Sequence, residues 1–260
     1  MPTETMSPLL SLRGLRKSYG GVEALRGIDL DVEAGDVLAI CGDNGAGKSS
    51  LIRIVSGAQE RSGGTVTLRG EPVNFRSPQE ALALGVATIY QDLALAPRLS
   101  IVENVFMGAE LTRPLIGRFL NVLDKRRMAA DARAYLARLG IDIADMRRAV
   151  ERLSGGQRQA VAISRALRWN AGIVIMDEPT AALGVKESAQ VLGLIRRLRQ
   201  EGRTVILISH NMADVVAVAT RVVILKNGAK VIDRPTTGLD ADRLAHMVMV
   251  GRDEAKAASA

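Results

Sequence analysis

Apolar runs of strand length recur along the chain, and amphipathic segments separate them. The clearest runs are residues 28–32, 37–41, 86–90, 172–177, 204–209 and 221–226. Nearly continuous apolar runs are typical of parallel strands that are buried on both faces of a sheet. Between two of these runs, apolar residues fall on one face of a helix, at Val191, Leu194, Ile195 and Leu198. The alternation predicts an α/β fold with a largely parallel sheet.

Two parts of the chain have a different pattern. Residues 65–70 and 72–75 predict a short antiparallel pair in the N-terminal part of the chain. From about residue 92 to residue 169 the apolar positions follow helical spacing and indicate no strand. One helix face there is formed by Met128, Ala132, Tyr135, Leu136 and Leu139. We therefore expect an α-helical subdomain at 92–169, inserted into a single domain that spans 1–260.

Composition restricts the possible classes of protein. Hydrophobic residues make up 47% and charged residues 24% of the chain, which is ordinary for a soluble globular protein. No run approaches the roughly 18 apolar residues that span a bilayer, and residues 1–8 lack the pattern of a signal peptide. The single cysteine, Cys41, excludes an internal disulfide and favours the reducing cytosol.

The formal net charge is +7, and a basic surface can attract nucleic acid, anionic lipid or phosphates. The basic clusters are short and scattered, at 124–128, 147–148 and 196–199, which is typical of solvated helix faces. Three Phe, three Tyr and one Trp provide few platforms for stacking single-stranded bases. We therefore expect no nucleic-acid partner.

A glycine-rich stretch follows the apolar run 37–41 and fits the phosphate-binding pattern GxxxxGK[ST]. Glycines allow several backbone N–H groups to wrap a phosphate, and the N-terminus of the following helix adds its unpaired donors. The Lys contributes a positive charge to the β- and γ-phosphates, and the first Ser can ligate Mg²⁺. A chance glycine-rich turn is the alternative. The predicted nucleotide-binding residues here are Gly42, Asp43, Asn44, Gly45, Ala46, Gly47, Lys48, Ser49 and Ser50.

Two neighbouring acidic residues stand at the end of the apolar run 172–177. Asp177 stands at the C-terminal end of this predicted strand, where it can hold Mg²⁺ through water. Glu178 follows and can polarise a water beyond the γ-phosphate. An acidic turn after a buried strand is the alternative, but its pairing with the phosphate loop predicts a nucleoside triphosphate hydrolase.

A second helix start with small residues lies at Ser154, Gly155, Gly156 and Gln157. Such an N-terminus can also hold phosphate oxygens. One ATP can use both helix starts if they come from two subunits that face each other.

The stretch "LSGGQ" resembles the signature motif of the ATP-binding-cassette (ABC) ATPases, and other family motifs stand in the expected order from about residue 9 to residue 251. The resemblance implies that Tyr19 stacks on adenine and that Gln91 contacts Mg²⁺ and the attacking water and senses a membrane partner. It also implies that His210 binds the γ-phosphate. Taken singly, these residues have alternatives: a packing aromatic, a loop glutamine and a structural histidine. The expected catalytic residues are Lys48, Gln91, Glu178 and His210, and the expected Mg²⁺ ligands are Ser49, Gln91 and Asp177.

The same resemblance implies an α/β P-loop NTPase fold with a RecA-like core. It predicts a mainly parallel sheet, an N-terminal antiparallel β subdomain and the inserted helical subdomain. It also places ATP between residues 42–50 of one copy and residues 154–157 of a second copy, in a homodimer.

One stretch departs from the family pattern. After the acidic strand end most cassettes have the sequence SALD, whereas this chain has AALG, with Gly184 at the position of the aspartate. In the family that aspartate helps to connect the two nucleotide sites, so its absence puts the details of their coupling in doubt. Glu178 and His210 remain, and we still expect hydrolysis.

The stretches at 89–111 and 177–188 resemble the single-cassette importers of simple sugars. This resemblance implies the ATP-hydrolysing subunit of a bacterial importer, attached peripherally to the cytoplasmic face of the inner membrane. Its expected partners are a separate multi-spanning permease and a periplasmic sugar-binding protein. An exporter cassette, or a soluble cassette that acts on nucleic acid or ribosomes, remains an alternative.

Overall fold

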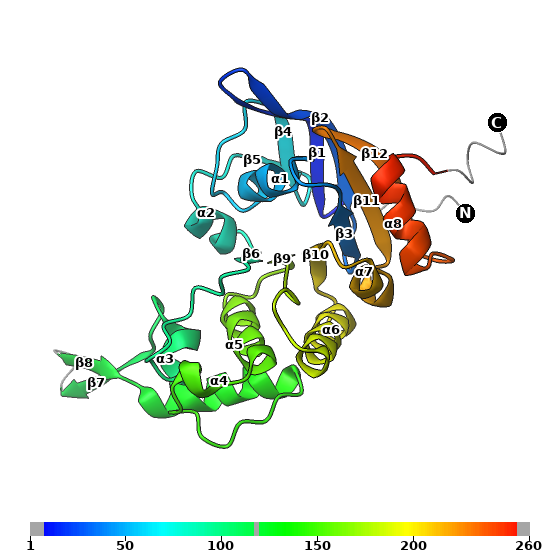
Figure 1. The fold of residues 1–260 in the computed structure, drawn as a ribbon. Helices are drawn as coiled ribbons and strands as arrows, with labels where there is room; N and C mark the ends of the chain where they lie inside the picture. The colour runs from blue at the N-terminus through cyan, green and yellow to red at the C-terminus, as the bar shows by residue number, and fades with distance from the viewer. Residues whose placement is uncertain (1–7, 117–119, 254–260) are drawn as a thin grey trace, which may run out of the picture.

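A computed structural model of the chain describes residues 8–116 and 120–253. Its main sheet has six strands in the order β12-β11-β3-β10-β9-β6 (Figure 1). The strands β11, β3, β10, β9 and β6 pair in parallel, and β12 pairs antiparallel with β11. The prediction of an α/β fold with a mainly parallel sheet is confirmed. The strand bounds are β3 Val37–Cys41, β6 Val86–Ile89, β9 Ile173–Asp177, β10 Thr204–Ile208, β11 Arg221–Lys226 and β12 Ala229–Pro235.

A smaller antiparallel sheet lies beside it, in the order β2-β1-β4-β5. Its antiparallel β4–β5 pair overlaps the two stretches, 65–70 and 72–75, that the sequence predicted as partners. The helix α1 (Lys48–Val55) packs in the core that the two sheets share, and the short helix α2 (Pro78–Ala83) precedes β6. The strand bounds are β1 Leu10–Tyr19, β2 Val22–Val32, β4 Gly63–Leu68 and β5 Glu71–Val73.

Alternate residues of the main sheet enter different cores. On β3, Val37, Ala39 and Cys41 face the core that the C-terminal helices cover, whereas Leu38 and Ile40 face the core shared with the antiparallel sheet. Burial on both faces explains why the parallel strands are apolar without interruption. Burial also raises the pKa of the Cys41 thiol to about 12, so the thiol stays protonated and unreactive.

The helical part of the chain contains α3 (Ile101–Phe106), α4 (Lys125–Arg138) and α5 (Gly155–Arg168). The expectation of no strand between residues 92 and 169 was wrong. A hairpin of β7 (Thr112–Ile116) and β8 (Leu120–Leu123) projects from this part of the molecule (Figure 1). Each strand is short and β7 contains Pro114, so the sequence has no strand periodicity there. The limits of the helical subdomain, 92–169, stay a prediction.

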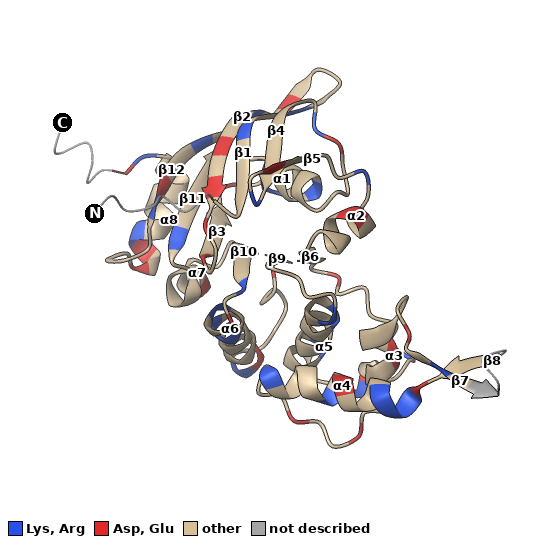
Figure 2. Ribbon diagram, turned by 180° about the vertical axis from the view of Figure 1, so that it is seen from behind, with Lys and Arg blue, Asp and Glu red and all other residues tan. Residues whose placement is uncertain are grey.

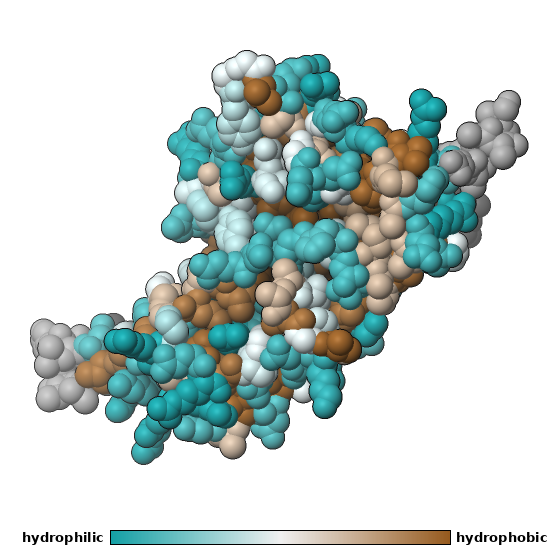
Figure 3. All heavy atoms as spheres, viewed as in Figure 1, coloured by the Kyte–Doolittle hydropathy of each residue, from teal (hydrophilic) through white to brown (hydrophobic). Residues whose placement is uncertain are grey.

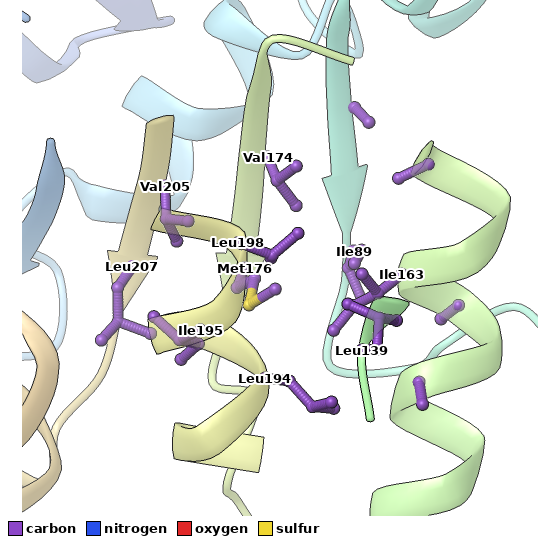
Figure 4. Packing of buried hydrophobic residues seen from close by; sticks show 14 of the residues in the cluster. Ile89, Leu139, Ile163, Val174, Met176, Leu194, Ile195, Leu198, Val205 and Leu207 are labelled. Carbon is purple, nitrogen blue, oxygen red and sulfur yellow. The ribbon is translucent and has the colours of Figure 1, made fainter. Parts of the chain in front are cut away.

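The helix α6 (Val185–Gln200) lies between β9 and β10 in the chain and packs against both β10 and α5. Figure 4 shows Ile195 and Leu198 of α6 packed toward β9 and β10, with Ile163 of α5 nearby in the same core. The predicted apolar face of α6 is buried. The remaining helices, α7 (Met212–Val218) and α8 (Ala241–Val250), cover the same side of the sheet.

Lys and Arg lie on many elements of both parts of the molecule, interspersed with Asp and Glu (Figure 2). Hydrophilic and apolar side chains alternate over the visible face, with apolar surface over the region of α3, α4 and α5 (Figure 3). Within residues 8–116 and 120–253, no helix has the length and apolar character needed to cross a bilayer.

We predict that the substitution Leu198→Ala lowers the free energy of unfolding by about 2–5 kcal/mol, because it leaves a cavity between α6 and the sheet. Leu198 is completely buried. Urea denaturation followed by circular dichroism measures the change. The exposed neighbour Gln200→Ala is the control, and we expect it to stay within about 0.5 kcal/mol of the wild type. Equal stability of the two variants would contradict the predicted packing of α6.

Candidate active site

The predicted phosphate loop, Gly42–Ser50, connects β3 to the first turn of α1. Gly42 and Gly47 have φ values of 148° and 104°, in the range that favours glycine. A Cβ atom on Gly42 would lie 2.3 Å from the backbone oxygen of Leu225, and one on Gly47 would lie 2.6 Å from that of Ala24. Neighbouring backbone therefore requires glycine at both positions, independently of any bound phosphate.

Lys48 closes this loop from the inside. Its Nζ donates hydrogen bonds to the carbonyl oxygens of Gly42, at 2.6 Å, and of Asp43, at 2.9 Å. Gly47 caps α1 without a side-chain acceptor, so the first N–H groups of the helix are not neutralised by a capping side chain. The loop thus gathers an ammonium group and uncapped helix donors, as a phosphate site requires.

Asp177 ends β9 beside β10, at the same edge of the sheet as the phosphate loop. Burial raises the pKa of this carboxyl above its usual range, with a smaller contribution from Glu178, while Lys48 opposes the shift. A cation at this position would compensate for the buried negative charge. The described part of the chain has no cluster of three or more His, Cys, Asp or Glu that could bind a metal alone. One carboxylate at the same edge as a phosphate loop suits Mg²⁺, which is bound by few carboxylates together with substrate phosphates.

Glu178 and His210 form a pair at the ends of β9 and β10. The Nδ1 atom of His210 lies 2.8 Å from Oε2 of Glu178, and the backbone N–H of His210 donates to the same oxygen at 3.4 Å. Glu178 has a φ of 50°, which is unusual for a residue other than glycine and is found at functional sites. Its side chain is 18% exposed, whereas that of His210 is 75% exposed. The imidazole is therefore held at one nitrogen and open to solvent elsewhere.

Gln91 follows β6 and lines a cavity of about 350 Å³. The cavity is also lined by Glu178, by Gly155 at the start of α5, and by residues 181–183 of the loop before α6. The structure therefore brings the predicted Gln91 and Glu178 together at the junction of the sheet and the helical part.

Tyr19, at the end of β1, lies beside the phosphate loop. Its hydroxyl donates to Oε1 of Gln59 at 2.5 Å and lies 3.3 Å from Oγ of Ser50. The Nζ atom of Lys17 lies 5.1 Å from the centre of the Tyr19 ring. Tyr19 is 41% exposed and its hydroxyl lies near Ser50, so an aromatic side chain stands next to the phosphate loop. Gln59 and Lys17, which orient the ring, carried no signal in the sequence.

The predicted second helix start is correctly placed at the N-terminus of α5. Ser154 and Gln157 form a capping box, in which each side chain accepts a hydrogen bond from the backbone N–H of the other residue. The N–H of Gly155 donates to Oε1 of Glu187, a residue of α6, at 2.8 Å. Sequence reasoning missed Glu187, because nothing in its local pattern distinguishes it from a solvated helix residue.

The predicted residues form two groups. The first lies at the carboxyl edge of the sheet and contains Lys48, Asp177, Glu178 and His210, with Gln91 at the cavity beside it. The second is the start of α5, Ser154–Gln157. Among the residues that the structure describes, no hydrogen bond or ion pair joins Gly42–Ser50 to Ser154–Gln157. One chain therefore has two separate sets of helix donors.

Comparison with known proteins decides which family combines these features. The family model described as "ABC transporter" matches residues 25–181, which is more than half of the chain. The chain is 48% identical over 243 residues to the fructose import ATP-binding protein of Rhizobium meliloti, covering 92% of this chain and 94% of that protein. This chain belongs to the ABC transporter family. As a member, it is an ATP-binding cassette with the ATP hydrolase activity of transporter ATPases.

Other cassettes agree with this assignment. The xylose/arabinose import ATP-binding protein of Sulfolobus acidocaldarius is 46% identical over 223 residues, which are 86% of each chain. A solved ABC transporter cassette in its ADP conformation superimposes with a TM-score of 0.79 at 25% identity, covering 94% of this chain and 99% of that one. A cassette solved as a post-hydrolysis dimer with ADP and Pi has a TM-score of 0.72 at 26% identity, covering 88% and 100%.

Gly184, the departure from the family pattern, is the N-cap of α6 and makes no side-chain capping bond. A Cβ atom on Gly184 would meet nothing within 4 Å, so crowding does not require glycine there. Its φ is −72°, which any residue can adopt, so backbone strain does not require glycine either. The preceding loop is held instead by a hydrogen bond of 2.7 Å from Thr180 Oγ1 to Asp214 Oδ2 of α7.

We predict that Asp177→Asn raises the stability of the nucleotide-free cassette at pH 7 and lowers its Mg²⁺-ATP turnover by about a hundredfold or more. The raised carboxyl pKa means that the ionised form costs folding free energy, and the amide removes this cost. The gain in melting temperature should shrink as the pH falls toward the usual pKa of an aspartyl group. Calorimetry across pH and a phosphate-release assay measure the two effects. A variant less stable than the wild type at neutral pH would contradict the argument.

Proposed function

We propose that this cassette hydrolyses ATP as a homodimer and drives the import of a simple sugar through a separate permease, at the cytoplasmic face of the membrane. The sugar class rests on the similarity to the fructose import ATP-binding protein over nearly the full length of both chains. The relatives named for xylose/arabinose and ribose import support the same class. A periplasmic sugar-binding protein completes the proposed complex.

The separation of the two sets of helix donors carries the dimer proposal. The phosphate loop and the start of α5 each present donors for phosphate oxygens, but no hydrogen bond or ion pair joins them within the part of the chain that the structure describes. In a head-to-tail pair, the loop of one copy would face Ser154–Gln157 of the other, with ATP between them. The solved cassette dimer with ADP and Pi supports a homodimer.

The chemistry follows from the groups at the edge of the sheet. Lys48 and the first N–H groups of α1 bind the β- and γ-phosphates, and Tyr19 provides a stacking surface for the base. Ser49 and Asp177, with Gln91 nearby, would hold Mg²⁺, which neutralises phosphate charge when bound. Glu178 orients and deprotonates the attacking water. Lys48, the first N–H groups of α1 and a bound Mg²⁺ would stabilise the negative charge that develops during transfer of the γ-phosphoryl group.

The hydrogen bond between His210 and Glu178 limits what the imidazole can do. A neutral imidazole that donates Nδ1–H to Glu178 presents a lone pair at Nε2, which repels a phosphate oxygen. A protonated imidazole donates at both nitrogens and can bridge Glu178 and the γ-phosphate. The nitrogen that Glu178 leaves free for the γ-phosphate is therefore Nε2.

Two hollows of the cassette suit a helix from the permease. One is the cavity at Gln91. The other has a volume of about 910 Å³ and lies between α3, the end of β8 and the start of α4, with a largely apolar lining. Closing and opening of the homodimer would move this docking surface and switch the permease between its two faces. The apolar lining of the larger hollow includes Leu99, Val102, Met107, Leu123, Met128 and Ala129.

We predict that Glu178→Gln binds ATP but hydrolyses it very slowly, and that ATP traps the variant as a dimer. This substitution removes the group that deprotonates water and keeps the side-chain shape. A membrane pull-down with this variant in ATP, followed by mass spectrometry, identifies the partners. We expect a multi-spanning permease of the simple-sugar type. Recovery of ribosomal proteins or nucleic acid would leave the ATPase assignment intact and refute import.

We predict that Met107→Glu reduces recovery of the permease without changing nucleotide affinity. Met107 is 39% exposed and lines the larger hollow, so a charge there would oppose docking of an apolar helix. Met249→Glu, at an exposed methionine of α8 outside both hollows, is the matched control. If both variants retain the permease equally well, the docking surface lies elsewhere.

A further inference from the structure

The start of α5 is held by α6 of the same chain. Glu187 lies in the first turn of α6, and its carboxylate accepts the N–H of Gly155 at 2.8 Å. A glutamate at this position of a helix commonly accepts a hydrogen bond from its own N-cap residue. Here it instead bonds a different helix, and Gly184 at the N-cap makes no side-chain bond.

The two glycines at the start of α5 permit this close approach. A Cβ atom on Gly155 would lie 2.4 Å from Leu183 Cδ2, and one on Gly156 would lie 2.3 Å from Gln190 Oε1. Leu183 and Gln190 flank Glu187 along the chain, before α6 and one turn further along it. The glycine pair is therefore a contact surface for α6 as well as a set of phosphate donors.

The hydrogen bond also determines which donors of α5 remain for phosphate. The N–H of Gly155 is used by Glu187, and the N–H of Gln157 is used by Ser154 Oγ. This leaves the N–H of Gly156 and the proton of the Ser154 hydroxyl for an ATP bound to the facing subunit. Glu187 thereby sets the orientation of the remaining donors at the helix start.

The chain between Glu178 and Glu187 is short and anchored. Glu178 donates its backbone N–H to the carbonyl of Ile208, the Thr180 hydroxyl donates to Asp214, and α6 then packs on β9 and β10. A change at Glu178, on one ATP site, can therefore reach Gly155, which serves the other site, through residues 179–187. The position where relatives of the SALD pattern have an aspartate is Gly184, which offers no side chain for this purpose.

We propose that Glu187 is a positioning residue that couples the two nucleotide sites, by fixing the helix start of α5 to the segment that follows Glu178. The proposal rests on the homodimer proposed above. Glu187 does not touch the reacting atoms; it holds Gly156 and Ser154 in the geometry that binds the γ-phosphate of the facing subunit. Removal of its carboxylate weakens dimer closure and leaves nucleotide binding to the phosphate loop of the single chain unaffected.

The test uses the full chain in the Glu178→Gln background, in which ATP is not turned over. Glu187→Ala removes the acceptor, and we expect ATP-dependent dimerisation to weaken about tenfold, in line with a lost hydrogen bond to a charged group. Glu187→Gln keeps an oxygen acceptor and should restore most of the dimer. Sedimentation velocity measures dimerisation, and a fluorescent ATP analogue measures binding to the monomer, which should not change.

Glu201→Ala is the matched control, because Glu201 caps the other end of α6 and bonds Arg138 of α4. We expect it to dimerise like the parent variant. Unimpaired dimerisation of Glu187→Ala, an equal loss in Glu201→Ala, or no rescue by Glu187→Gln would each overturn the proposal. A parent variant that stays monomeric in ATP would instead overturn the homodimer itself, and the coupling role with it.

Discussion

The parallel pairing of β3, β10, β9 and β6 is the constraint on which the site depends. Parallel strands end at the same edge of a sheet, so residues far apart in the sequence meet there. Gly42, Asp177, His210 and Gln91 each follow the carboxyl end of one of these strands. Because both faces of the sheet are buried, a shift in strand register would move side chains out of the positions into which they pack in the two cores. The packing of the whole core therefore also stabilises the geometry of the nucleotide site.

Negative charge is concentrated at this edge of the sheet. Asp177 and Glu178 are neighbours, and the partly buried Asp177 carboxyl has a raised pKa despite the presence of Lys48. Such an arrangement is less stable by itself than with a cation bound, so the free energy lost in folding is recovered on binding metal and nucleotide. The positive φ of Glu178 is a second local strain at the same place. Both features agree with a site that is organised for a ligand.

Much of this molecule could be predicted from the sequence because the relevant signals are local. The strand at 37–41, the following glycines and the helix start at Ser154 can each be recognised from a few neighbouring residues. The hairpin β7–β8 was missed because its strands are short and contain Pro114. Gln59 beside Tyr19 and Glu187 beside Gly155 act across 40 and 32 positions of the chain, so only the fold reveals their partners.

Because Cys41 is buried, its reaction with a thiol reagent can report local unfolding of the main sheet. Cys41 is the chain's only cysteine, and it ends the strand that carries the phosphate loop. A thiol reagent can reach it only when β3 separates from its neighbours, so the rate of labelling follows local unfolding at the centre of the sheet. A bound nucleotide would slow that labelling in proportion to its occupancy, which converts an inert side chain into a measure of ligand-linked stability.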